Sequence, residues 1–290
     1  MIIKVNRVGP CFRRLNTRKP KRFVFMSQII ERIEQEISLS DFCFRFLIPN
    51  RPVIFSEKFT QNWTSRKDWV DQYGKPRLDF LSENYGKAEV CVVDCNSREH
   101  GDFPRKVMRF DEIVNDWKNQ KAERNSRNKH GCLYVKDWHF CREFPDYKAY
   151  EIPVVFQGTV CRIFAVVFFL ILYYVDDWMD AWWKERKDVD DDFRFVYIGT
   201  HGTWTPFHAD VFRSYSWSAN ICGRKQWTLF PPGEEKNFVR GGSSKRVWDI
   251  READDSPKEH TGWNDIKRIE FTQQPGEIVF GKIVWNCTCT

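Results

Sequence analysis

The stretch Thr205-Pro206-Phe207-His208-Ala209-Asp210 decides how this sequence is interpreted. On an extended strand, side chains alternate between the two faces, so a histidine and an aspartate two residues apart point the same way. His208 and Asp210 can then hold one metal ion through an imidazole nitrogen and a carboxylate oxygen. They supply two of the three ligands of a two-histidine, one-carboxylate Fe(II) site, which leaves coordination positions open. Taken alone, the triplet is equally well a surface or core pair.

The residues around this triplet favour a ligand site. Thr205 stands three residues before His208, and segment 216–232 has the pattern of a hairpin, with two apolar-rich runs around Gly223 and a closing pair of prolines. Lys225 begins the second run. A lysine ammonium and a threonine hydroxyl offer a small dicarboxylate a positive charge and a hydrogen-bond donor. Without these neighbours, Lys225 would be interpreted as a solvated turn residue.

This region resembles a known family. The runs W-T-P-F-H-A-D (204–210) and W-S-A-N-I-C-G-R-K-Q-W-T-L-F-P-P (217–232) are similar to the JmjC class of 2-oxoglutarate- and Fe(II)-dependent oxygenases, and within it to protein lysyl hydroxylases. The likeness covers most of the span from about residue 27 to 280. Its further segments are 46–52, Trp63, 74–76, 94–96, 176–178 and 275–280.

The resemblance implies a role for each site residue. By position, His208 and Asp210 would bind iron, Thr205 and Lys225 would bind 2-oxoglutarate, and Ser218 would add a polar contact to this co-substrate. The implied reaction consumes 2-oxoglutarate and O2, releases succinate and CO2, and hydroxylates a substrate C–H bond. The implied partner is a protein substrate, with a lysine in a translation termination factor as the leading candidate. A histone-directed demethylase is the alternative activity.

The sequence departs from the family pattern after Phe280. There the family enters a strand whose Trp-His pair supplies the third iron ligand, but residues 281–290 contain no histidine. The only histidine after the H-A-D triplet is His260, which we interpret as a solvated loop residue. Cys287 and Cys289 offer thiolates, which suit zinc or copper better than a ferrous site. We therefore expect an atypical, non-native tail and an unpaired sheet edge. A catalytically inactive binding protein is the alternative to an enzyme.

Residues 163–175 form an unbroken apolar run. A membrane-spanning helix needs about 20 such residues, and shorter runs are more often buried core. In the family, the residues that flank this region stand almost adjacent. We interpret 158–175 as an insertion from a translated intron, with a membrane anchor and a buried strand as alternatives. A membrane location is not expected.

The basic charge of the chain is concentrated at its start. Residues 1–26 carry eight Lys or Arg and no acid, whereas the whole chain has a net charge of +6. The remainder is therefore near neutral, which does not favour nucleic-acid binding. We expect 1–26 to be a disordered leader. The ten cysteines show no regular spacing and no secretory signal precedes them, which indicates reduced thiols in the cytoplasm or nucleus.

The order of predicted elements indicates an α+β fold, with a helical N-terminal region followed by strands. The resemblance implies a JmjC double-stranded β-helix, a jelly-roll or cupin-like barrel, which we expect to be incomplete at its C-terminus. The expected divisions are a leader (1–26), a helical and β part (27–150), the insertion (158–175), the barrel core (176–280) and the tail (281–290). Helices are predicted near 27–38, 40–47, 66–73, 110–121 and 176–186. Strands are predicted near 52–55, 88–93, 132–136, 193–199, 216–222, 225–230 and 277–280.

Overall fold

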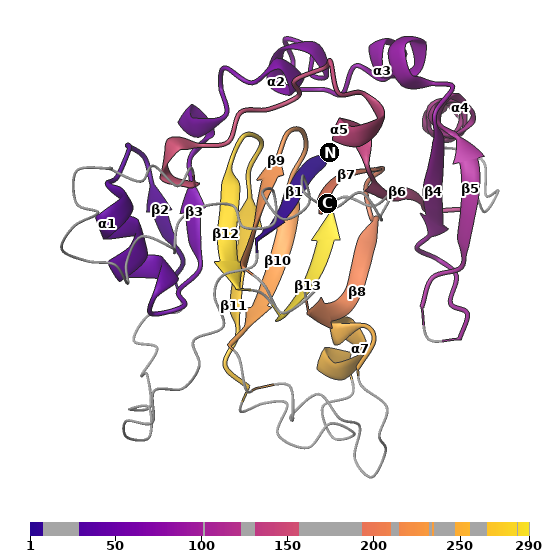
Figure 1. The fold of residues 1–290 in the computed structure, drawn as a ribbon. Coiled ribbons are helices and arrows are strands. Elements are labelled where there is room, and N and C mark those ends of the chain that lie inside the picture. The colour runs from indigo at the N-terminus through magenta and orange to yellow at the C-terminus, as the bar shows by residue number, and fades with distance from the viewer. Residues whose placement is uncertain are drawn as a thin grey trace, which may run out of the picture.

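Two β-sheets organise this protein, and helices cover one side of the larger sheet (Figure 1). The computed structural model of the 290-residue chain describes residues 1–7, 29–100, 102–122, 131–156, 193–209, 215–231, 234, 247–255, 266–282 and 284–289. Within these residues the fold is mixed α+β, as the sequence predicts.

The elements have the following bounds. The strands are β1 Ile2–Arg7, β2 Glu31–Ile33, β3 Val53–Phe55, β4 Glu89–Asp94, β5 Arg105–Arg109, β6 Leu133–Trp138, β7 Arg194–Gly199, β8 Trp204–Ala209, β9 Tyr215–Asn220, β10 Lys225–Phe230, β11 Ile269–Gln273, β12 Ile278–Lys282 and β13 Val284–Cys289. The α-helices are α1 Leu39–Phe42, α2 Thr64–Asp68, α3 Leu78–Tyr85, α4 Phe110–Ala122, α5 Phe140–Glu143 and α7 Ile250–Asp255. A π-helix, η1 Cys43–Leu47, and two 3-10 turns, η2 Glu57–Phe59 and η3 Val154–Phe156, complete the described elements.

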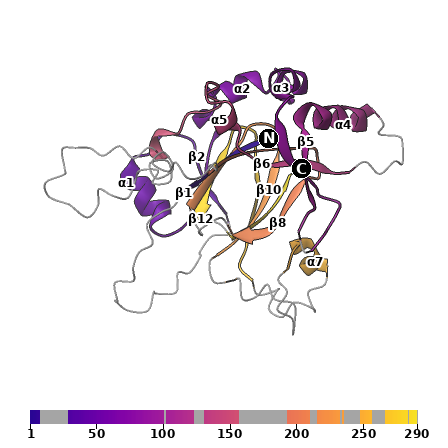
Figure 2. The ribbon, with the colours of Figure 1, turned by 45° about the vertical axis from the view of Figure 1, so that its right-hand side comes forward.

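The larger sheet has the strand order β2-β3-β12-β9-β1-β7-β6-β4-β5, and the smaller sheet has the order β11-β10-β13-β8. The sequence predicts a barrel, but the described strands form two separate sheets and no closed barrel. Strands β6, β4 and β5 extend the larger sheet beyond the span of the smaller one (Figure 1), and the two sheets face each other in both views (Figures 1 and 2).

The outer face of the larger sheet packs against the helices. On β9, Trp217 and Ala219 belong to the main hydrophobic core, together with residues of α1, η1, α3, α4 and α5. The intervening Ser218 is also fully buried, but it lies on the opposite, inner face because side chains alternate along a strand. Strand β9 therefore separates an apolar outer core from a more polar interior.

The inner face of the larger sheet meets the smaller sheet. Trp227 and Leu229 of β10 pack against Ile54 of β3 and Val279 of β12. This contact identifies the side of the smaller sheet that faces the interior. It also fixes the faces of all residues paired in register with Trp227 and Leu229.

Strand β13 occupies a place that the sequence predicts to be empty. It pairs antiparallel with β10 on one side and with β8 on the other. The prediction of an unpaired tail over 281–290 was therefore wrong for Val284–Cys289. A strand at this position forms backbone hydrogen bonds with two neighbours. These hydrogen bonds form even though the side chains after Phe280 depart from the family pattern.

The first strand also contradicts a sequence prediction. Residues 1–26 are predicted to be disordered, but β1 lies between β7 and β9 and pairs antiparallel with both. Its start, Ile2-Ile3-Lys4-Val5, is rich in β-branched residues, whose preference for strands is masked by the basic residues that follow. The rest of the predicted leader, residues 8–26, lies outside the described residues.

The remaining element predictions have mixed outcomes. The seven predicted strands and the helices near 40–47 and 110–121 are confirmed. The predicted helix over 27–38 was wrong, because residues 31–33 form β2, parallel to β3. The helix predicted over 66–73 is α2, which begins and ends earlier. The insertion 158–175, the helix 176–186 and His260 lie outside the described residues. In the part of the chain that the structure describes, no helix has the length and apolar character to cross a bilayer.

Candidate functional site

A β-bulge sets the direction of side chains on β8. This strand pairs with β13 so that Thr205 lies opposite Cys287 and His208 lies opposite Trp285. The two residues between Thr205 and His208 therefore face a single residue of β13, which is the count that defines a β-bulge. Positions 285 and 287 lie on one face of their strand. Thr205 and His208 consequently share a face too, although three residues separate their positions.

The local sequence explains the bulge. Pro206 has no N–H to donate to a neighbouring strand, and proline within sheets is confined to edges, strand starts and bulges. The N–H of Phe207 donates to the carbonyl oxygen of Trp248 at 3.0 Å. Strand β8 ends the strand order of its sheet. This hydrogen bond therefore uses an edge at which no other described strand pairs.

Three of the predicted site residues share the inner face of the smaller sheet. The row that begins at Thr205 continues across β13 to Trp227 on β10. Trp227 packs against the larger sheet, so this face is the interior one. Lys225 lies two residues before Trp227 and is on the same face. The structure therefore brings Thr205, His208 and Lys225 to one face.

The ring of His208 is oriented by its own strand. Its Nδ1 lies 2.8 Å from the carbonyl oxygen of Pro206. A carbonyl oxygen only accepts hydrogen bonds, so Nδ1 carries a proton. In the neutral imidazole the lone pair is then on Nε2, which is a usual arrangement for a metal-ligating histidine. Asp210, the predicted second ligand, lies outside the described residues, and its pairing with His208 stays a prediction.

Lys225 is a buried cation, with only 6% of its surface exposed. Its Nζ lies 3.8 Å from the centre of the Trp227 ring. No carboxylate lies within ion-pairing distance of it among the described residues. A cavity of about 460 Å³ reaches Lys225 from the side of α3 and α4, where Leu78 and Trp117 line it. The described site residues Thr205, His208 and Ser218 do not line this cavity, so its volume is not that of the space they face.

Ser218 lies on the inner face of the larger sheet, in register with Val279. Its Oγ is buried and makes no hydrogen bond to any described residue. An unsatisfied buried hydroxyl costs about 1–3 kcal/mol, so it indicates a polar ligand or water. Ser218 and Lys225 together have the chemistry to bind a carboxylate, which is the character of 2-oxoglutarate.

Gln273 is a residue of this interior that the sequence analysis did not identify. It is fully buried on β11 and connects the two sheets. Its Nε2 donates to the carbonyl oxygen of Ser218 at 2.8 Å, and its Oε1 accepts from Nε1 of Trp227 at 2.7 Å. The one sequence signal for it was a glutamine within an otherwise strand-like segment, which is too weak to assign a role.

Of the two predicted metal ligands, His208 lies within the described residues and Asp210 lies outside them. Among the described residues, no three His, Cys, Asp or Glu side chains are grouped as a metal site. His208 fits the role of one protein ligand to iron, because a proton on Nδ1 places the lone pair of the neutral ring on Nε2. No histidine occurs in 281–290 to provide a third ligand.

Comparisons with known proteins show which proteins this chain resembles. Residues 195–285 match the family model of the JmjC domain, described as a hydroxylase. The chain is 40% identical over 262 residues to the 2-oxoglutarate and iron-dependent oxygenase JMJD4 of Danio rerio, which covers 90% of this chain and 57% of that protein. For the protein of the same name in Homo sapiens, the identity is 37% over 269 residues, with 92% and 58% covered.

A relative that is named for a different activity is nearly as similar. The chain is 39% identical over 263 residues to the arginine-specific demethylase JMJ20 of Arabidopsis thaliana, which covers 89% of this chain and 54% of that protein. The chain spans a little more than half the length of these relatives. Its match over 195–285 and its similarity along about 90% of its length lead to one conclusion: the chain contains a JmjC domain and is similar to the JMJD4 oxygenases.

Proposed function

We propose that this chain is a 2-oxoglutarate- and Fe(II)-dependent oxygenase that hydroxylates a lysine side chain of a protein. The observation that carries the proposal is the buried ammonium of Lys225, which has no carboxylate partner among the described residues and shares a face with His208. Burial of an unpaired charge costs several kcal/mol. An anionic ligand accounts for a lysine at this position.

Each residue has a role in this proposal. Lys225 holds the far carboxylate of 2-oxoglutarate, and the hydroxyls of Thr205 and Ser218 donate hydrogen bonds to it. Nε2 of His208 and the carboxylate of Asp210 hold the iron. When bound, iron and 2-oxoglutarate together supply the oxidising chemistry that inserts oxygen from O2 into a C–H bond. The chain's own contribution is to orient these groups and to exclude water from the space between the sheets.

The experiment that tests the proposal measures 2-oxoglutarate binding to the purified chain by calorimetry, with Mn(II) present as a redox-inactive substitute for iron. We expect binding that Lys225→Met weakens at least about tenfold, since one charge-assisted carboxylate contact is lost. Arg224→Met, which removes the neighbouring exposed cation, is the matched control and should leave the affinity unchanged. Equal affinities for all three proteins would exclude the proposed role of Lys225.

Turnover is tested separately, with Fe(II), O2 and peptides that contain lysine. The lysine substrate rests on the resemblance of the sequence to lysyl hydroxylases, and peptides from translation termination factors are the first substrates to test. We expect succinate formation that depends on the peptide and a gain of one oxygen atom on its lysine. Loss of a methyl group from a methylated arginine peptide would instead support demethylation, the activity for which the Arabidopsis thaliana relative is named.

A non-catalytic binding protein is the second candidate. The absence of a histidine from 281–290 favours it, because a centre with one ligand missing holds iron weakly. Binding of 2-oxoglutarate or of a peptide without any succinate formation would select this candidate.

A further inference from the structure

A short segment after residue 246 lies against the edge strand of the smaller sheet. It consists of residues 247–249 and the first turn of α7, which lies directly below β8 in Figure 1. Its contacts reach two residues of β8 on the outer face, Trp204 and Phe207. The ring of Phe207 packs with Val247 and Ile250, and the ring of Trp204 packs with Trp248. The segment therefore covers the outer face of the strand that carries His208.

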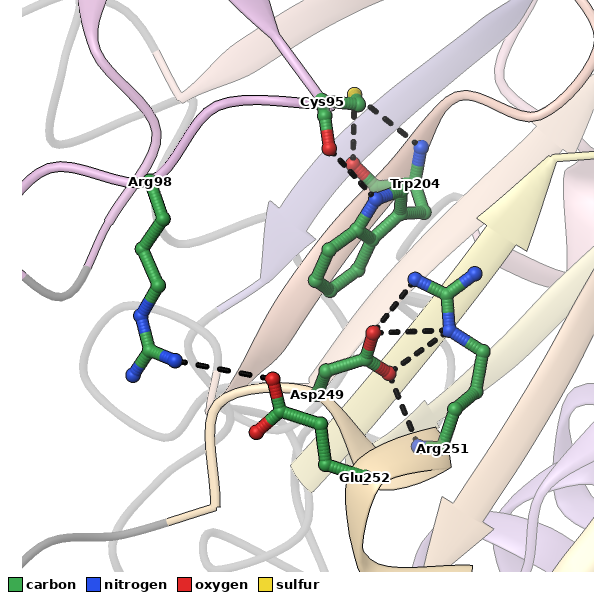
Figure 3. A network of polar contacts seen from close by, with 6 residues as sticks. All are labelled: Cys95, Arg98, Trp204, Asp249, Arg251 and Glu252. Atoms are coloured by element: carbon green, nitrogen blue, oxygen red, sulfur yellow. Dashed lines mark hydrogen bonds and ion pairs between the residues drawn. The ribbon is translucent and has the colours of Figure 1, made fainter. Parts of the chain in front are cut away.

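Asp249 and Arg251 connect this segment to β8. Asp249 is buried, and its two carboxylate oxygens accept from Nε and Nη2 of Arg251 at 2.9 and 2.6 Å, as Figure 3 shows. The backbone N–H of Arg251 also donates to Asp249 Oδ1 at 2.9 Å. The guanidinium of Arg251 lies over the ring of Trp204, with its Cζ 4.5 Å from the ring centre.

Trp204 is itself held from its other side. Its indole Nε1 donates to the carbonyl oxygen of Cys95 at 3.2 Å, and its backbone N–H and carbonyl oxygen both contact the Cys95 sulfur at 3.5 Å (Figure 3). A closed network of contacts therefore connects β8 with residues 248–251. It runs from Trp204 through Arg251 and Asp249 to Trp248, and returns to β8 through the hydrogen bond from Phe207.

We propose that the Asp249–Arg251 pair and the Trp248 carbonyl are a positioning device that keeps the bulge of β8 in place, and thereby keeps Thr205 and His208 on one face. This inference rests on the proposed function, because it assigns these residues to the alignment of the ligand site. None of them lies on the inner face of the smaller sheet.

The physical reason is the alternation of side chains on a strand. Without the bulge, residues three positions apart lie on opposite faces, so Thr205 and His208 would not both face the interior. The bulged N–H of Phe207 has its partner on the edge of the sheet, outside the β8–β13 ladder. If the Trp248 carbonyl moves, this N–H gains by rejoining the ladder, and a shift of one residue turns one of the two side chains outward.

The test compares the whole chain with three single variants. Asp249→Asn removes the charge of the carboxylate, and Arg251→Met removes the guanidinium while keeping an aliphatic stem. Glu252→Gln is the matched control, because Glu252 lies beside the pair and its side chain forms an exposed ion pair with Arg98 at 3.7 Å (Figure 3). Two quantities are measured at equal folded fraction: the amide hydrogen exchange rate of Phe207, and the affinity for 2-oxoglutarate with Mn(II).

We expect Asp249→Asn and Arg251→Met to raise the Phe207 exchange rate and to weaken 2-oxoglutarate binding, each by about tenfold. Glu252→Gln should change neither by more than about twofold. If Arg251→Met does not fold, Arg251→Lys replaces it, since lysine keeps the charge but lacks the bidentate fork. A variant that merely loosens the fold would raise exchange across both sheets instead of at Phe207.

Two results separate this inference from the proposed function. Unchanged Phe207 exchange and unchanged affinity in folded Asp249 and Arg251 variants would overturn the inference alone. A wild-type chain that binds no 2-oxoglutarate would overturn the proposed function. In that case the exchange rate of Phe207 still decides whether Asp249 and Arg251 hold the bulge.

Discussion

Lys225 is a buried cation whose proposed role in ligand binding would come at a cost to stability. Its ammonium is buried beside an indole ring, and a cation–π contact is worth about 0.5–2 kcal/mol, less than the cost of removing a charge from water. Methionine has a similar length and no charge. We therefore expect Lys225→Met to raise the free energy of unfolding by about 1 kcal/mol in the absence of ligand. Urea unfolding at neutral pH measures this difference.

The control for this prediction is again Arg224→Met, at an exposed position, which should change stability by less than about 0.5 kcal/mol. Binding of 2-oxoglutarate should reverse the order of stability of the wild-type chain and the Lys225→Met variant. With 2-oxoglutarate present, the wild-type chain should gain stability and the Lys225→Met variant should not. A Lys225→Met variant that is less stable without ligand would show that the lysine has a structural role.

Asp137 is a second residue whose environment leads to a prediction. It lies at the irregular part of β6, with a positive φ of 57°. Its carboxylate accepts hydrogen bonds from the Tyr197 hydroxyl at 2.8 Å and from Arg105 Nη1 at 2.9 Å. Burial raises the pKa of this carboxyl, but the charge of Lys136 and the two hydrogen bonds outweigh burial, so the net pKa is below its ordinary value.

A lowered native pKa means that the charged form stabilises the fold above the ordinary carboxyl pKa of about 3.9, and that this stabilisation is lost as the pH falls through the native pKa. Asparagine tolerates positive φ as aspartate does. We therefore expect Asp137→Asn to lower the free energy of unfolding by roughly 1–2 kcal/mol at pH 7. The difference should shrink below about pH 4. A difference that stays constant over this pH range in urea titrations would contradict the assignment.

Strand β1 is the element whose position matters most to the larger sheet. Lys4 pairs with Phe195 on β7 and with Ser218 on β9, so the strand supplies hydrogen bonds on both sides. Proline at position 4 removes one donor from a central strand. We expect Lys4→Pro to lower the free energy of unfolding by roughly 2 kcal/mol or more, whereas Lys4→Thr should cost less than about 1 kcal/mol. Equal stability of the two variants would show that β1 is not paired in solution.

At the scale of elements, the sequence predicted those whose pattern is local. Strand β10 and helix α4 were predicted to within a residue or two, because apolar periodicity reports which face is buried. The positions of β1 and β13 were not predictable in this way. Both are held by pairing with strands far away in the sequence, and the basic or atypical composition of their surroundings indicated a disordered leader and a tail.

The candidate site shows the same division. His208, Thr205 and Lys225 were singled out from residue type and spacing, and the structure places them on one face. The bulge that makes this possible depends on Trp248, some forty residues away in sequence, and was not foreseen. Gln273 was missed because its function in the interior comes from hydrogen bonds to two different sheets. Contacts of this range have no local pattern in a sequence.

For the molecule as a whole, the register between β8 and β13 determines which position could place a further metal ligand beside His208. Position 287 lies opposite Thr205, on the face that His208 shares, and is a diagonal neighbour of His208 on the adjacent strand. Diagonal neighbours are roughly 7–8 Å apart at Cα, a distance that two imidazoles can bridge with one ion. By the alternation of positions along a strand, position 286 belongs to the other face of β13. The register thus indicates where a third ligand would complete the site.

We therefore expect Cys287→His to bind Co(II), a spectroscopic substitute for Fe(II), about tenfold or more tightly than Cys287→Ala, because the imidazole supplies a coordinate bond and alanine leaves position 287 without a ligand. The alanine variant is the reference because the thiolate of Cys287 can itself bind Co(II). Asn286→His adds the same group to the other face and should leave the affinity within about twofold of wild type. Visible absorption of the Co(II)-loaded proteins measures both affinities. If the two variants bind Co(II) equally, the metal is not held on the face of His208. If only Cys287→His binds it tightly and forms succinate, the wild-type chain has the oxygenase architecture but lacks a ligand for turnover.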